Sequence, residues 1–186
     1  MSKTLTFSLI LVSLIVGLGG GYFLSPYYTP YSQSESSMSS HFGTVDRWVD
    51  LRYIDKMIAH HRGAILMAKN IEAKTDRQEI KDLVQSIYPG ETKLIDELYS
   101  WKKAWYNDYT VVRDPVVPNF GAKDDKADLR FLNALIAHHQ LGIDMTKEIR
   151  IKSSRTEIIN NADGVEKFLT ETKAGLTDWR KTWYQI

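Results

Sequence analysis

The strongest constraint on the fold is an internal duplication: residues 50–106 recur, without a gap, as residues 128–184. Both copies begin with Asp-Leu-Arg and end with a Trp-x-x-x-Trp-Tyr motif. Each copy carries an adjacent pair of histidines at the same place. A repeat at constant offset indicates a duplicated supersecondary unit, so the fold is expected to contain two copies of one small motif.

Each copy is predicted to be a helical hairpin. In its first half, apolar and histidine residues recur at spacings of three and four, which places them on two adjacent seams of one helix. In the first copy the seams hold Leu51, Ile54, Ile58, His61 and Ile65, and Tyr53, Met57, His60, Ala64 and Met67. Two such hairpins predict an all-α fold, an antiparallel four-helix bundle over residues 44–186.

Two details of the bundle follow from the same pattern. Asp76 with Glu79, and Ser154 with Glu157, have the spacing of capping residues at the start of each second helix. The tryptophans are expected to pack against one another at one end of the bundle.

The N-terminal region differs in character from the repeats. Residues 1–24 contain an apolar run preceded by Lys3, close to the roughly 20 residues that span a bilayer as a helix. This predicts a hydrophobic helix acting as a signal-anchor, or alternatively a cleaved secretory signal. The positive-inside rule then places the bundle outside the cytoplasm, periplasmic and membrane-tethered, or secreted if the segment is cut. Residues 25–43, rich in Ser, Tyr and Pro, are predicted to be a flexible stalk.

Composition narrows the function. Lys and Arg number 24 against 23 Asp and Glu, and no basic run is present, so nucleic acid is not an expected partner. The chain has no cysteine, which leaves methionine as the only soft metal ligand. No arrangement typical of nucleophilic catalysis is recognisable, so the protein is not expected to be an enzyme.

Four of the five histidines form the two pairs, His60-His61 and His138-His139. Both pairs fall on core-facing seams, and a pseudo-twofold bundle would bring them face to face. Residues seven apart on a helix lie on one stripe roughly 10 Å apart, so a histidine and the methionine seven residues later are too distant to share an ion. A metal site therefore needs ligands from both histidine-bearing helices. The methionines expected to assist are Met67 and Met145 at a second level, and Met57 near the first.

Imidazole and thioether donors without thiolate suit Cu(I), or Ag(I) as its mimic. Zinc remains possible at a level of four histidines. A carboxylate-bridged di-iron centre is not expected, because the Glu-x-x-His motif is missing. The alternative is a structural or interaction bundle whose histidines are hydrogen-bonded core residues without metal, and a third reading is an oxidase of metal ions. The fifth histidine, His41, is expected to be solvated and idle.

The paired His-His-x5-Met motifs resemble a known family, domain of unknown function 305, over roughly residues 44–186. The resemblance implies a ferritin-like four-helix bundle outside the cytoplasm that is associated with copper binding and tolerance. We expect the role of the protein to be sequestration or hand-over of the ion, without turnover. Because this chain has only five methionines, a small number of sites is expected. By position, the resemblance assigns as metal ligands His60, His61, Met67, His138, His139 and Met145.

Overall fold

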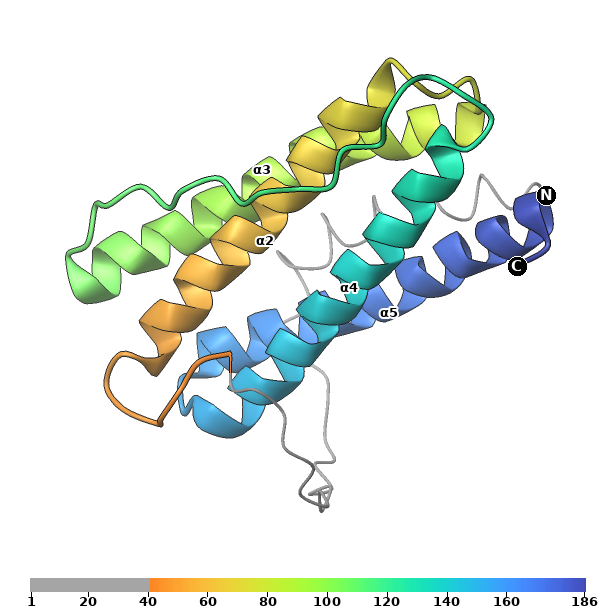
Figure 1. Ribbon diagram of the computed structural model, residues 1–186. Helices are drawn as coiled ribbons and strands as arrows, with labels where there is room; N and C mark the ends of the chain where they lie inside the picture. Colours follow the sequence, from red (N-terminus) through yellow and green to blue (C-terminus); the bar gives the residue numbers. More distant parts are fainter. Residues whose placement is uncertain (1–40) are drawn as a thin grey trace.

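The computed structural model describes residues 41–186, and this part of the chain is all-α (Figure 1). The predicted N-terminal hydrophobic helix and most of the predicted stalk lie outside the described residues. Within residues 41–186, no helix is both long and apolar enough to cross a membrane. The four helices are α2 (Val49–Glu72), α3 (Gln78–Tyr106), α4 (Ala127–Lys152) and α5 (Thr156–Tyr184).

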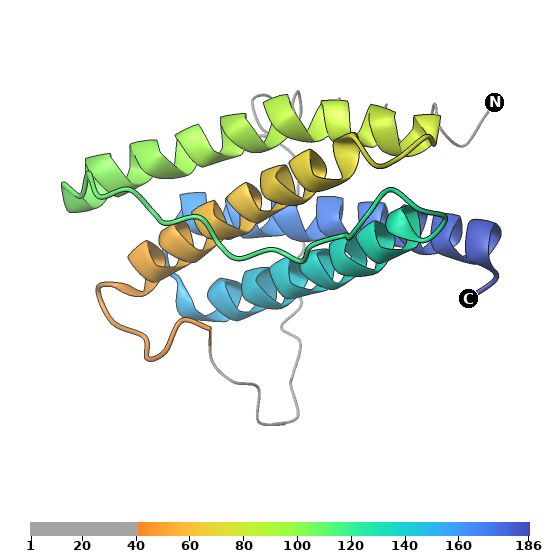
Figure 2. The same cartoon turned by 45° about the horizontal axis from the view of Figure 1, so that its top comes forward.

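The helices pack as a four-helix bundle made from two hairpins, as the duplication predicts. α2 pairs with α3 and α4 pairs with α5, and the hairpins meet mainly through α2 and α4. Figures 1 and 2 show α2 and α4 side by side and running in opposite directions. The connector of residues 107–126 returns along the bundle from the end of α3 to the start of α4. α2 and α4, the two helices that carry the histidine pairs, therefore face each other.

The core consists of two apolar clusters, each with residues from all four helices. One contains Met67, Ile80, Phe131 and Leu176, and the other contains Tyr53, Leu98, Ile143 and Ile158. Along α2 and α4 the histidine pairs fall between the residues of these two clusters. The predicted seams are thus buried, and the histidines occupy the middle of the bundle.

The duplication extends to contacts upstream of the repeated helices. Arg52 Nε donates to the Phe42 carbonyl at 2.6 Å, and Arg130 Nε donates to the Phe120 carbonyl at 2.7 Å. Phe42, at the end of the predicted stalk, is fully buried and packs edge-on against Tyr53 with ring centroids 5.6 Å apart. The chain is therefore fixed to the bundle before α2 begins.

The N-terminal ends of α3 and α5 differ from the predicted capping boxes. The capping boxes are not formed, because the residues that precede α3 and α5 are Arg77 and Arg155, with no side-chain cap. Instead, their backbone amides donate to the side chains of Thr75 and Ser153. Local turns of this kind compete with the helix-capping geometry.

The tryptophans do not gather at one end of the bundle. Trp105 stacks on Trp101 and lies under the Arg155 guanidinium, whereas Trp183 stacks on Trp179 and lies under Arg77. Because the hairpins are antiparallel, these two clusters form opposite ends of the molecule.

Candidate metal site

His60 of α2 and His138 of α4 meet at the centre of the bundle. Their rings are stacked, with centroids 3.8 Å apart and an interplanar angle of 11°. His60 Nε2–H donates a hydrogen bond to the His138 carbonyl at 3.0 Å. The expectation that the two histidine pairs approach each other across the core therefore holds for the first histidine of each pair.

Two glycines make this close approach possible. A Cβ added at Gly142 would lie 2.7 Å from His60 Nε2 and 2.4 Å from Leu169 Cδ1. A Cβ added at Gly63 would lie 3.0 Å from His138 Cε1. The missing side chains leave room for the imidazole of the facing helix in both cases.

The substitution Gly142→Ala tests this packing. Overpacking in a core costs roughly 1–3 kcal/mol, and the better helix propensity of alanine returns about 1 kcal/mol of that. We expect a net destabilisation of about 1 kcal/mol, measured by urea denaturation. The matched control is Gly175→Ala in α5, at a half-buried glycine, which should be neutral or stabilising. Equal stability of both variants would contradict the steric role of Gly142.

The second histidine of the first pair has a charged partner. His61 Nδ1–H donates to Glu91 Oε2 of α3 at 2.5 Å, and both side chains are largely buried. Glu91 was not singled out from the sequence, although counting along the hairpin places the neighbouring Tyr88-Pro89 segment level with the histidines. The sequence signal that could have identified Glu91 is its position two residues after Pro89.

Each of the four paired histidines has one buried ring nitrogen without a hydrogen-bond partner among residues 41–186: His60 Nδ1, His61 Nε2, His138 Nε2 and His139 Nδ1. In His60 and His61 the other ring nitrogen donates its proton to an oxygen, so the free nitrogen carries a lone pair. An unpaired buried acceptor costs free energy. A ring that donates one N–H to a carbonyl or carboxylate and leaves the other nitrogen bare is the arrangement of metal-binding histidines.

Burial also keeps three of the paired histidines, His60, His138 and His139, neutral. It lowers the pKa of His60 and of His139 to about 4, and the pKa of His138 well below its usual value. The neighbouring histidines lower all three pKa values further. Since metal ions bind the deprotonated imidazole, these three rings have the form of a ligand at pH 7 without prior loss of a proton.

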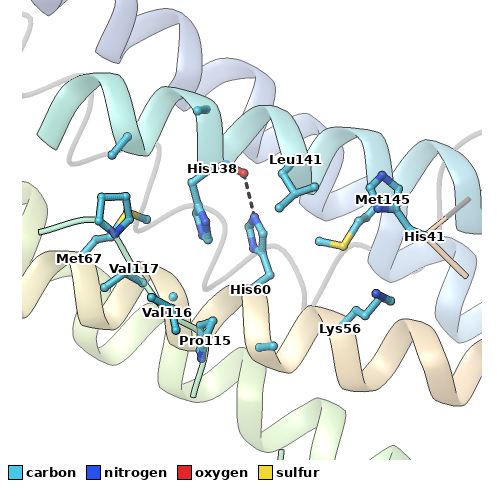
Figure 3. A pocket seen from close by; sticks show the side chains of 15 residues that line it. His41, Lys56, His60, Met67, Pro115, Val116, Val117, His138, Leu141 and Met145 are labelled. Carbon is cyan, nitrogen blue, oxygen red and sulfur yellow. Dashed lines mark hydrogen bonds between the residues drawn. The ribbon is translucent and has the colours of Figure 1, made fainter. Parts of the chain in front are cut away.

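Thioether and imidazole side chains line the same cavity of about 450 Å³ between α2 and α4. Its walls include His60, His138, Met67 and Met145, and residues 115–118 of the connector lie against it (Figure 3). Figure 3 shows Met67 on the His138 side and Met145 on the His60 side. The two methionines thus lie at opposite ends of the cavity and do not share one level, because antiparallel helices place equivalent residues at opposite ends.

The other predicted ligands lie elsewhere. Met57 is fully buried in the apolar cluster around Tyr53 and does not line the cavity. His61 and His139 are buried and are also absent from the cavity wall. Conversely, the wall includes His41, the histidine expected to be idle.

The described residues contain no group of three or more His, Asp or Glu side chains arranged to hold a metal ion. The four-histidine level considered for zinc is therefore not formed in residues 41–186. The side chains that line the cavity offer imidazole nitrogen and thioether sulfur, a donor set that fits a soft monovalent ion.

The fold and the cavity define a class of small helical bundles with paired core histidines beside methionine side chains. Residues 50–127 match the family model described as Domain of unknown function (DUF305). This match confirms the resemblance to that family over residues 50–127, which contain the first His-His-x5-Met motif.

Solved structures of one protein, CopM, share the fold. CopM in the Cu(I)-bound form is 24% identical to this chain, with a TM-score of 0.66, and the match covers 74% of this chain and 99% of CopM. CopM in the Ag-bound form obtained by soaking is 25% identical, with a TM-score of 0.64 and the same coverage of 74% and 99%. No curated protein matches the chain in sequence, and no enzyme family is detected.

Proposed function

We propose that this protein binds Cu(I), with Ag(I) as its mimic, and sequesters it or hands it over in copper homeostasis, without turnover. The observation that carries the proposal is one cavity that brings together two imidazoles and two thioethers, His60 and His138 with Met67 and Met145. The described residues contain no cluster of three His, Asp or Glu side chains that would form a site for a harder metal ion.

The chemistry of the donors favours a soft ion. Thioether sulfur prefers Cu(I) over Mg, Ca or Mn, and neutral imidazole is compatible with copper. The depressed pKa values of His60 and His138 keep both rings available at neutral pH. The likeness to CopM, whose structures include Cu(I)-bound, Cu(II)-bound and Ag-bound forms, supports the same class of ion. Nothing comparable supports zinc.

His61 and His139, which are buried but do not line the cavity, have a supporting role in this proposal. His61 is fixed by Glu91 on α3. His139 is also buried, and the Glu91 carboxylate acts on its pKa. The carboxylate orients the His61 imidazole, as carboxylates commonly do for metal-bound histidines.

The site of action follows from the N-terminal sequence. We place the bundle outside the cytoplasm, periplasmic and tethered by the hydrophobic segment of residues 1–24, or secreted if that segment is cleaved. The absence of cysteine is compatible with an oxidising compartment.

The test is a titration of the full-length chain, purified in a mild detergent, with Cu(I), Ag(I), Cu(II) and Zn(II) against a competing chelator. Binding of Cu(I) or Ag(I) should also raise the melting temperature, because a ligand at 100 times its Kd stabilises the native state by about 2.7 kcal/mol. Zn(II) should bind much more weakly. Failure of every ion to bind at micromolar concentration would refute the proposal.

The structural alternative has its own supporting observation. His60 and His61 both donate hydrogen bonds inside the protein, as core histidines without metal would. That reading does not account for the four unpartnered ring nitrogens, nor for the convergence of two methionines on the same cavity. It predicts no metal binding and no stabilisation by metal in the titration above.

A further inference from the structure

We propose that the cavity holds two separate sites for a soft monovalent ion, and that His41 is a ligand of one of them. The first site consists of His41, His60 and Met145, and the second of His138 and Met67. The inference rests on the proposed function, since it concerns the number and the composition of sites in the same cavity.

The duplication and the antiparallel packing divide the cavity in two. Figure 3 shows Met145 toward the His60 side of the cavity and Met67 toward the His138 side. Each end therefore combines an imidazole from one central helix with a thioether from the other. His60 and His138 stack face to face at the middle, and stacked rings direct their nitrogens away from a common point between them. This geometry favours one ion at each end over one shared ion.

His41 belongs to the first end and is held there by the fold. Its backbone amide donates to Glu148 Oε2 at 2.8 Å, and the amide of Phe42 donates to Glu148 Oε1 at 3.1 Å. Glu148 lies one turn beyond Met145 on α4, so the same helix supplies the thioether and the anchor for His41. The side chain of His41 lines the cavity, and Figure 3 shows it at the same end as Met145.

Among the described residues, the second end of the cavity has no such third donor. In the duplicated alignment, Asn119 corresponds to His41 and Asn70 corresponds to Glu148. Asn70 Nδ2 donates to the Pro118 carbonyl at 3.2 Å, so it holds the connector in the place where Glu148 holds His41. The aliphatic and proline side chains of residues 115–118 line this end of the cavity. The first site thus has two nitrogens and one sulfur, and the second has one nitrogen and one sulfur.

The consequence is two sites of unequal affinity. Three ligands hold an ion more tightly than two of the same kind, so the site with His41 is expected to fill first. Half-burial of His41 at the end of the cavity also leaves this site nearer to solvent, as a position for capture or transfer requires.

The experiment is an Ag(I) titration of the full-length chain against a competing chelator, comparing wild type with His41→Asn. This substitution installs the residue that the second end has and keeps the backbone hydrogen bonds to Glu148. Wild type should bind two ions, and His41→Asn should weaken the tighter one by about tenfold or more without changing the other. Met145→Leu should remove the same tighter site, and Met67→Leu only the weaker one.

A second readout separates ligation from a structural effect. The ring nitrogens of His41 should shift in ¹⁵N NMR spectra with the first equivalent of Ag(I), and the melting temperature of ion-free His41→Asn should match wild type. Identical titrations of His41→Asn and wild type would overturn the inference, as would loss of all binding in either single methionine variant. Absence of Ag(I) binding in wild type would instead overturn the proposed function itself.

Discussion

Replacement of Met67 and Met145 together by leucine is expected to lower the affinity for Ag(I) by about 100-fold or more, with the fold retained. Leucine has nearly the same volume as methionine, and such swaps in a core usually cost less than about 1.5 kcal/mol. The two side chains are 2% and 4% exposed, so the packing changes little while both sulfurs disappear. Chelator competition measures the affinity, and circular dichroism measures helix content and melting temperature.

The matched control for this variant is Met57→Leu. Met57 is fully buried in the core but outside the cavity, so its replacement should leave Ag(I) affinity unchanged. Alanine replacement of His60 and His138 also removes donors, but it abolishes the ring stack and the hydrogen bond between α2 and α4. It should therefore reduce both binding and stability. Unchanged Ag(I) affinity in the double leucine variant would rule out the thioethers as ligands.

Acidification of the ion-free protein is expected to reduce its stability sharply between pH 7.5 and pH 5. The pKa of His60 and of His139 is about 4 in the folded protein, against about 6.5 in the unfolded chain. Above pH 6.5 both states are neutral and full stability is present. As the pH falls below 6.5 the unfolded chain takes up protons first, and the loss continues until the folded protein also titrates near pH 4.

The size of this effect follows from the same two pKa values. By pH 5 the loss amounts to about 2 kcal/mol for each of His60 and His139, and His138 adds to it in the same direction. Urea unfolding at pH 7.5 and pH 5 measures the difference, in a range where ordinary carboxylates stay ionised. The control is His139→Gln, which should show a smaller difference than wild type. Equal stability at the two pH values would contradict the burial of neutral histidines.

Much of this architecture follows from the sequence alone. The repeat at constant offset and the spacing of three and four determine four helices in two hairpins, and they place His60, His61, His138 and His139 on inward-facing seams. This succeeds because helical periodicity fixes the direction of each side chain relative to its own helix axis. The same local rule distinguishes the core seams from the solvent face without knowledge of any other helix.

The identity of the neighbours was decided by tertiary structure. The absence of a side chain at Gly142 lets His60 pack against α4. Glu91 of α3 accepts a hydrogen bond from His61. Glu148, more than 100 positions away along the chain, accepts a hydrogen bond from the backbone amide of His41. Periodicity also cannot distinguish Met57 from Met67, which share a seam although only Met67 lines the cavity. The physical reason is that the relative register of two helices depends on how their side chains interlock across the interface, and that fit is a property of both surfaces together.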